Sequence, residues 1–425
     1  MAEQNRPVLT ALTGLRAVAA IGVVVSHSGV PASLPEHLGR IASWGHIGVP
    51  MFFMLSGVVL AYNYPDLRGW EGRCTIRFYI ARIARVMPLY WAVIAYCAVY
   101  LWAYGRPNHG WALLQNLLAV QTWSGDLKVA MGYYNSPGWS IGVELFFYAL
   151  FPFLVPLVAS LARRSGARGL ILLILAMTAV ILTLWAAFHL TGHSSFKADN
   201  PASAHRWLYR NPLCHLPMFV VGMAVAFLIP YTGRWSTGRH QAIQAFVFSY
   251  VFGLAAFRPM GSGWSSAAYG LLFVVPFALV MISLASGRGW MARILSTTVM
   301  VRLGLASYAL YLTHRWILFD LGTADRIRTG GGWAPYGALL ITLAVLLLIA
   351  EGAHQYIEEP ARRLLVRFTR RWTSGGTSHA APTSTTPGPG GPASEAAPPG
   401  RLATAGPRPS LAGRHNPVDA AGRAT

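Results

Sequence analysis

The sequence predicts an all-α, polytopic membrane protein: a transmembrane helical bundle of about ten spans with a disordered C-terminal tail. Of its 425 residues, 54% are hydrophobic and 11% are charged, and the mean hydropathy is +0.44. Soluble domains carry about 25% charged residues, so this balance indicates a membrane protein. Long apolar stretches recur along the chain, and each spanning helix needs about 20 such residues.

Ten stretches have the length and composition of a spanning helix, or nearly so. They lie near residues 9–29, 47–63, 87–104, 139–162, 169–190, 213–231, 241–257, 266–286, 300–320 and 334–356. The segment 109–123 is apolar but too short, and we interpret it as re-entrant or interfacial. Arg16 interrupts the first apolar run, which continues to spanning length, so we expect the first helix to stay in the mature protein and not to act as a signal peptide.

The arginines predict the orientation of the bundle. Lys and Arg number 34 against 14 Asp and Glu, and the connections 64–86, 163–168 and 287–299 hold many of the arginines. Positively charged loops stay in the cytoplasm, so we expect these connections and both termini on the cytoplasmic side of a bacterial plasma membrane. If residues 109–123 crossed, the connection 163–168 would move outside. We expect basic residues here to contact the lipid bilayer or an anionic ligand, and we expect no nucleic-acid partner.

Three regions follow from this pattern: a membrane-embedded domain at 1–357, a cytoplasmic amphipathic helix at 358–372, and a disordered tail rich in Pro, Gly and Ala at 373–425. In the second region the apolar residues can share a face opposite the arginines, which predicts a helix lying on the inner leaflet. The third has too few aliphatic clusters to form a core. The three cysteines have no metal or redox spacing, so we expect no disulfide framework and no bound metal.

Three ionisable residues on different helices reach the outer third of the membrane in this topology. His27 ends the first span, Glu144 lies near the outer start of the fourth, and His314 lies near the outer end of the ninth. Ionisable groups inside a membrane are costly and usually functional. A histidine paired with a carboxylate is a candidate general base. Polar contacts that merely tie helices together are the alternative.

A second group of polar residues lies on the inner side. Arg77, Arg82 and Arg85 alternate with apolar and aromatic residues, and Arg82 and Arg85 share one helical face by their spacing of three. Guanidinium groups on one face suit phosphate, which they bind bidentately. The alternative is an ordinary cytoplasmic loop that contacts anionic lipid.

Six short motifs together resemble the acyltransferase 3 family of integral membrane acyltransferases. In order they are LTGLRAVAAIGVVVSH (12–27), GVPMFFMLSG (48–57), RFYIARIARVMPLY (77–90), WSIGVELFFY (139–148), SYALYLTH (307–314) and EEPARR (358–363). Each motif is short and rich in common membrane residues, but six in one order are hard to obtain by chance. The resemblance covers everything except the tail.

The resemblance implies transfer of an acyl group, often acetyl from cytoplasmic acetyl-CoA, to a hydroxyl of a sugar, an envelope glycan or a macrolide-type metabolite. The family's essential histidine corresponds to His27, and the paired arginines thought to meet the CoA phosphates correspond to Arg82 and Arg85. The supporting positions implied by the other motifs are Arg16, Ser56, Glu144 and His314. Thr13 and Pro50 stand where acids are common in the family, which leaves Arg16 with fewer obvious partners.

These observations together give a mechanistic hypothesis. Arg82 and Arg85, with Arg77 nearby, hold the nucleotide end of acyl-CoA, which is a co-substrate and not a resident cofactor. His27 takes the proton of the acceptor hydroxyl, and Glu144 orients its ring. Ser56 or Tyr308 donates to the developing oxyanion. An acyl-histidine intermediate is the alternative chemistry.

Two other functions are compatible with such a bundle: a secondary transporter or flippase of a glycan or metabolite, and a membrane scaffold. Transporters often show internal repeats and matching broken helices, and the sequence shows neither. The acceptor is not determined by the sequence. The outer connection 191–212 is polar enough to contact a sugar, but a solvated loop has the same composition.

Overall fold

The computed structural model describes residues 8–69, 72–107, 109–130, 132–197, 199–257 and 271–374. All of them belong to one unit, Met1–Gly376. The predicted disordered tail lies, from residue 375 onward, outside the described residues.

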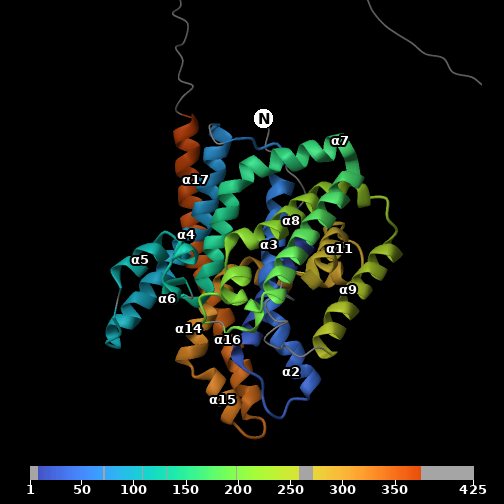
Figure 1. The fold of residues 1–425 in the computed structure, drawn as a ribbon. Coiled ribbons are helices and arrows are strands. Elements are labelled where there is room, and N and C mark those ends of the chain that lie inside the picture. The colour runs from blue at the N-terminus through green and yellow to red at the C-terminus, as the bar shows by residue number, and fades with distance from the viewer. Residues whose placement is uncertain are drawn as a thin grey trace, which may run out of the picture. The chain divides into compact units, whose positions relative to one another are not determined.

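Helices of very different lengths form the bundle (Figure 1). In the first half they are α1 (Thr10–Ser28), α2 (Glu36–Ser43), η1 (Trp44–Ile47), α3 (Gly48–Asn63), α4 (Arg73–Ala103), α5 (Gly110–Leu117), η2 (Gln121–Trp123), α6 (Leu127–Ala130), η3 (Ser136–Gly138) and α7 (Trp139–Leu190). In the second half they are η4 (His193–Ser195), η5 (His205–Tyr209), α8 (Pro212–Thr232), α9 (Thr237–Phe257), η6 (Leu271–Phe273), α11 (Val274–Ala285), α12 (Trp290–Leu295), α13 (Thr298–Leu305), α14 (Ser307–Asp320), α15 (Thr323–Thr329), α16 (Ala334–Ala353), η7 (His354–Glu358) and α17 (Glu359–Ser374).

The predicted fold class, an all-α membrane bundle, is confirmed. Within the described residues, seven helices are long and apolar enough to cross a membrane. One of these, α7, turns back on itself at Gly166, whose φ of 54° is in the left-handed region that glycine tolerates. The two spans predicted at 139–162 and 169–190 are therefore the two arms of α7 (Figure 1).

Several predicted boundaries were wrong. The helix α4 begins at Arg73, so four of the five arginines placed in the connection 64–86 lie in the first turns of a 31-residue helix, and only Arg68 precedes it. The span predicted at 300–320 is broken at Ala306 into α13 and α14. Of 266–286, the described part forms the short apolar helix α11, and residues 258–270 lie outside the described residues. Residues 109–123 form only α5 and η2, too short to span, as expected.

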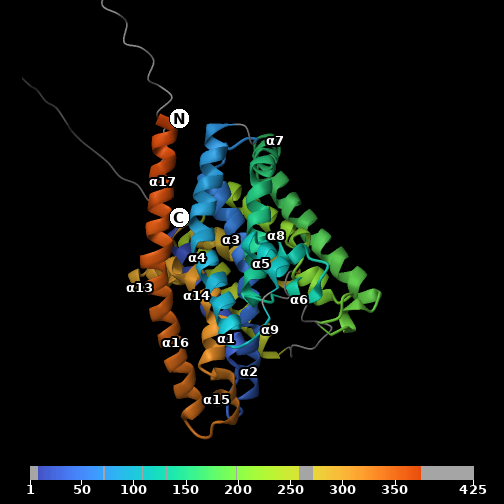
Figure 2. The ribbon, with the colours of Figure 1, turned by 90° about the vertical axis from the view of Figure 1, so that its left-hand side faces the viewer.

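The last helices also differ from the prediction. The helix expected at 358–372 exists as α17, but it continues α16 through the π-helical turn η7 in one long rod and packs along α4 (Figure 2). The turn onto the membrane surface expected after the last span is therefore not seen.

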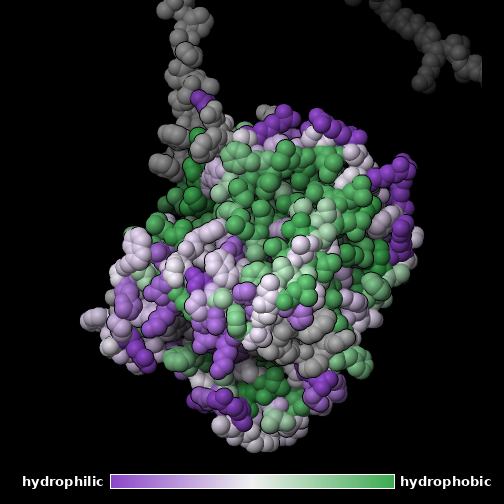
Figure 3. All heavy atoms as spheres, in the orientation of Figure 1, coloured by the Kyte–Doolittle hydropathy of each residue, from purple (hydrophilic) through white to green (hydrophobic). Residues whose placement is uncertain are grey.

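The surface has the distribution of a membrane protein. Figure 3 shows a broad hydrophobic area over α7 and its neighbours, with hydrophilic residues gathered above and below it. At the upper end in Figure 1 lie the start of α4, the bend of α7 and α17, which together hold many of the arginines.

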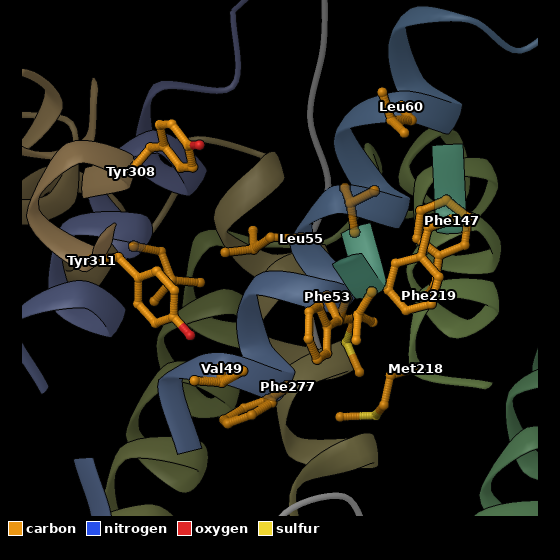
Figure 4. Packing of buried hydrophobic residues seen from close by; sticks show 14 of the residues in the cluster. Val49, Phe53, Leu55, Leu60, Phe147, Met218, Phe219, Phe277, Tyr308 and Tyr311 are labelled. Carbon is orange, nitrogen blue, oxygen red and sulfur yellow. The ribbon is translucent and has the colours of Figure 1, made fainter. Parts of the chain in front are cut away.

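The centre of the bundle is the packing of α3 and α7 against α8 (Figure 4). The rings of Phe147 and Phe219 are stacked with centroids 4.7 Å apart. Two glycines let α3 and α8 approach closely: a Cβ at Gly222 would lie 2.0 Å from the carbonyl oxygen of Met54, and one at Gly57 would lie 2.2 Å from that of Phe219. Small residues at such crossings are the usual basis of close helix packing in membranes. This contact fixes α3, which carries Ser56, beside α7, which carries Glu144.

The close approach at Gly222 gives a stability prediction. Gly222→Ala forces α3 and α8 apart and lowers the free energy of unfolding by about 1–3 kcal/mol, as overpacking generally does. Thermal unfolding of the purified protein in detergent, followed by tryptophan fluorescence, measures the effect. Gly253→Ala in α9 is the matched control, because a Cβ there has no atom within 4 Å. Equal melting temperatures for the two variants would contradict this packing.

Candidate active site

Residues from six parts of the chain line a cavity of about 180 Å³ near the end of α1. They come from α1, η1, α3, η3 with the start of α7, the η5 region, and α14. The lining residues are Ser26, His27, His46, Val49, Ser136, Pro137, Trp139, His205, Tyr209, Arg210, Tyr311, His314 and Arg315. His27 and His314, which we predicted to share a depth, are both among them.

Local sequence explains how α14 contributes to the cavity. Tyr308, Tyr311, His314 and Arg315 recur at spacings of three and four, which places them along one side of the helix. Tyr311 and His314 are buried, whereas Arg315 is exposed. The helix α14 packs against α1, and His314 contacts His27 there.

His27 and His314 form a hydrogen bond whose direction can be assigned. The Nδ1 atom of His314 lies 2.5 Å from the carbonyl oxygen of Tyr311 and therefore donates, because a carbonyl oxygen can only accept. In a neutral ring Nε2 then accepts, and it lies 3.2 Å from Nδ1 of His27. The Nδ1–H of His27 also faces the carbonyl oxygen of Val23 at 3.0 Å. Consequently, the Nε2 atom of His27 bears the lone pair of a base.

The surroundings of the two rings differ in a way that suits this assignment. His314 is fully buried and His27 is exposed at the cavity. The ring centroids are 5.1 Å apart. A buried histidine that accepts a hydrogen bond from the Nδ1–H of a second histidine fixes the orientation and the tautomer of that second ring. A positioning group supports a general base in this way.

Glu144 is not the partner of His27, contrary to the prediction. Its carboxylate accepts hydrogen bonds from Tyr148 and from Ser56, the latter at 3.5 Å. Glu144 is five residues further along α7 than Trp139, about 7.5 Å at the rise of an α-helix. The depth estimate from helix length was too coarse to separate it from the cavity.

Glu144 belongs instead to a second polar cluster nearer the start of α1. Arg16 lies within electrostatic range of the Glu144 and Glu358 carboxylates, and of Arg85. Tyr148 lies within the same range of Arg82 and Arg85. Arg16 therefore has two carboxylate neighbours from α7 and η7, although Thr13 and Pro50 offer none.

The three arginines of α4 have different environments. The guanidinium carbon of Arg82 lies 5.7 Å from the ring centroid of Tyr64 and 5.9 Å from that of Phe78. Its Nε is buried and has no hydrogen-bond partner among the described residues. Arg85 is half-buried. Arg77 is exposed near the start of α4.

The two predicted oxyanion donors lie away from the cavity. The Tyr308 hydroxyl donates to the carbonyl oxygen of Val86 at 2.7 Å, and the Ser56 hydroxyl donates to Glu144. Tyr311 connects the two polar regions, because it lines the cavity and is within electrostatic range of both Arg210 and Glu144.

Sequence reasoning missed much of the cavity lining. None of His205, Arg210 and Arg315 was predicted as a site residue, although the first two lie in the polar connection 191–212. Arg210 is five residues after His205, and Arg315 directly follows His314, so proximity in sequence was the available signal. Burial and then the Arg210 charge lower the pKa of His205 to about 4. This ring is therefore neutral near pH 7, and its Nε2 accepts from Nε of Arg210 at 3.3 Å.

Comparison with known proteins decides the family. A family profile described as "Acyltransferase domain", that of the acyltransferase 3 family, matches residues 9–351. The chain belongs to this family. The activity of such a membrane protein is acyl transfer, and the prediction from the six motifs is confirmed at this level.

Individual relatives agree with this assignment. The chain is 29% identical over 382 residues to acyltransferase MdmB of Streptomyces mycarofaciens, covering 84% of this chain and 93% of the relative. It is 22% identical over 383 residues to O-acetyltransferase OatA of Staphylococcus aureus, covering 84% of this chain and 57% of that one. Protein 2 in the picA locus of Rhizobium radiobacter is 32% identical over 201 residues, covering 41% of this chain. No solved structure matches significantly.

The hydrogen bond between the two histidines gives a test of the positioning role of His314. His314→Leu removes the acceptor of the His27 Nδ1–H and lowers kcat for acyl transfer by about tenfold or more, part of the 10²–10⁴ that a general base supplies. KM for the donor changes little. His314→Gln, whose amide oxygen can accept the same hydrogen bond, restores part of kcat. Equal losses in both variants would argue for a merely structural role.

Proposed function

We propose that this chain transfers an acyl group, of acetyl size, from cytoplasmic acyl-CoA to a hydroxyl of a sugar, envelope glycan or macrolide-type metabolite. The observation that supports it best is the histidine pair at the cavity, which leaves Nε2 of His27 unprotonated and accessible. The family of the chain and the names of its relatives, an acyltransferase and an O-acetyltransferase, support the reaction class.

The chemistry proceeds by general-base catalysis in this proposal. His27 Nε2 removes the proton of the acceptor hydroxyl while the oxygen attacks the thioester carbonyl. A C–O bond forms, the C–S bond breaks, and the proton on His27 passes to the departing CoA thiolate. His314 acts as a positioning residue, since it holds the Nδ1–H of His27 and touches no reacting atom.

The donor enters from the end of the bundle where Arg82 and Arg85 lie. Guanidinium groups suit the phosphates of CoA, and the unsatisfied buried Nε of Arg82 is a donor available to a ligand. Tyr148 lies within electrostatic range of both arginines and donates to Glu144, and Tyr311, at the cavity, lies within range of Glu144; these contacts outline a polar path between the two sites. We propose that the pantetheine arm follows this path to His27. Arg77 is exposed nearer the start of α4 and remains a predicted contact of the donor.

The orientation of the chain in the membrane belongs to the same proposal. The arginine-rich starts of α4 and α17 and the bend of α7 face the cytoplasm of a bacterial cell, in keeping with the usual excess of positive charge there. Both termini are then cytoplasmic, and the histidine cavity lies toward the outer side.

The experiment that tests the function is acyl transfer in membranes that express the protein, with labelled acetyl-CoA and extracted glycans and lipids as acceptors. His27→Ala lowers the labelled product by about 10²–10⁴, the contribution of a general base. His189→Ala is the matched control, because that histidine is exposed at the end of α7 and lies outside the cavity. Labelling that persists in His27→Ala overturns the base assignment, and substrate flux without covalent product in the wild type indicates transport instead.

A comparison of two acyl donors, one with phosphates and one without, tests whether the arginines bind the nucleotide. Arg82→Gln and Arg85→Gln each raise KM for acetyl-CoA by about tenfold or more, since a hydrogen bond to a charged group is lost. S-acetylpantetheine, which has no phosphate, reacts equally well with wild type and variants. Arg164→Gln, an exposed arginine at the bend of α7, is the control. If both donors lose the same amount, the arginines support the fold and do not bind the nucleotide.

A further inference from the structure

The cavity around His27 has an unusual balance of charged residues. The described residues that line it include two arginines, Arg210 and Arg315, but neither aspartate nor glutamate. Both guanidinium groups lie within electrostatic range of His27, and Arg315 is also within range of His314. A ligand whose hydroxyl reaches His27 therefore experiences two positive charges.

Arg210 is held in a defined orientation within this cavity. Its side chain is only 9% exposed, its Nε donates to His205, and its guanidinium carbon lies 5.8 Å from the ring centroid of Trp139. His205 and Trp139 both line the same cavity. The planar fork of a guanidinium matches the oxygens of a carboxylate or phosphate, which it can bind through two parallel hydrogen bonds.

Arg315 places a second positive charge at the exposed side of the cavity. It directly follows the buried His314 on α14, and its own side chain is exposed. The two arginines come from different elements: Arg210 directly follows η5 and Arg315 lies in α14, and both line this cavity. One arginine is thus buried and pre-oriented, and the other is accessible to an incoming ligand.

We propose that the acceptor of acyl transfer carries an anionic group, a carboxylate or a phosphate, which Arg210 and Arg315 bind while the acceptor hydroxyl faces His27. This inference rests on the proposed function for the identity of the ligand, because it narrows the acceptor class from hydroxylated sugars or metabolites to anionic ones. Anion binding itself does not depend on turnover, and so the two are tested separately.

A different role for the two arginines makes a distinct prediction. If they only stabilise the negative charge that develops on the thioester oxygen, they act in the transition state and give no preference among free acceptors. An anionic acceptor, in contrast, binds more tightly than its neutral analogue before any reaction. The equilibrium affinity for matched ligands therefore separates the two roles.

The test is ligand binding to the purified full-length protein in phosphatidylcholine nanodiscs. Methyl β-D-glucuronide and methyl β-D-glucoside differ only in having a carboxylate or a hydroxymethyl group, and glucose 6-phosphate supplies a phosphate. We expect the Kd of at least one anionic sugar to be about tenfold or more below that of the glucoside. Arg315→Gln removes most of this preference, and Arg164→Gln at the other end of the bundle retains it.

Because Arg210 is buried, the Arg210→Gln variant is interpreted only if its melting temperature stays near that of the wild type. If it does not, the exposed Arg315→Gln variant alone decides the test. The proposal is overturned if the three sugars bind equally well or if none of them binds detectably. It is also overturned if the double variant with Arg315→Gln and Arg210→Gln still prefers the anionic sugar. Repeating the titration in phosphatidylglycerol nanodiscs examines a lipid headgroup as the anion: loss of the preference there contradicts an acceptor role. His27→Ala should keep the binding preference and lose transfer. If the anionic sugar still binds more tightly but His27→Ala retains acyl transfer, the proposed function is overturned and the anion site is not.

Discussion

A hydrogen bond joins the last turn of α1 to α14 across 287 residues of sequence, and the proposed chemistry depends on it. Its direction follows from elementary bonding rules, since the Tyr311 carbonyl can only accept and so leaves the Nε2 atom of His314 as an acceptor. This choice also sets the tautomer of His27, whose accessible Nε2 is the proposed base. The backbone carbonyl of Tyr311, acting through His314, thus determines which nitrogen of His27 can take a proton.

The contacts that support this pair are those of a closely packed membrane bundle. Glycines at the α3–α8 crossing bring backbones together, and a Cβ at Gly45 would lie 1.9 Å from the carbonyl oxygen of Gly22 in α1. The latter contact holds η1, which carries His46, against the C-terminal half of α1. Because helices in lipid gain no hydrophobic energy from association, such close packing is what fixes the depth of each polar side chain.

The two polar clusters lie at different depths in the bundle and have different roles in the proposed reaction. The cluster near the start of α1 combines Arg16, Arg82 and Arg85 with two carboxylates, Glu144 and Glu358, which offset part of their charge. The cavity has histidines and arginines without a carboxylate among its described lining. The cluster near the start of α1 therefore suits a donor that carries several phosphates, because the carboxylates moderate its binding and allow its release. The cavity suits a neutral base with an anionic acceptor. Tyr311 is common to both regions.

The sequence by itself determined the all-α membrane class, most of the spans and the family, and it predicted His27 and His314, which line one cavity, as candidate site residues. These follow from local composition, the length of apolar runs and short motifs, all of which are properties of neighbouring residues. Tertiary structure decided that Glu144 pairs with Ser56 and Tyr148 and lies within range of Arg16, while His314 orients His27. It also brought Arg210 and Arg315 to one cavity. Helix length gives the depth of a residue only to within a turn or two, whereas a hydrogen bond requires its partners within about 3 Å on facing sides, and packing alone sets that facing.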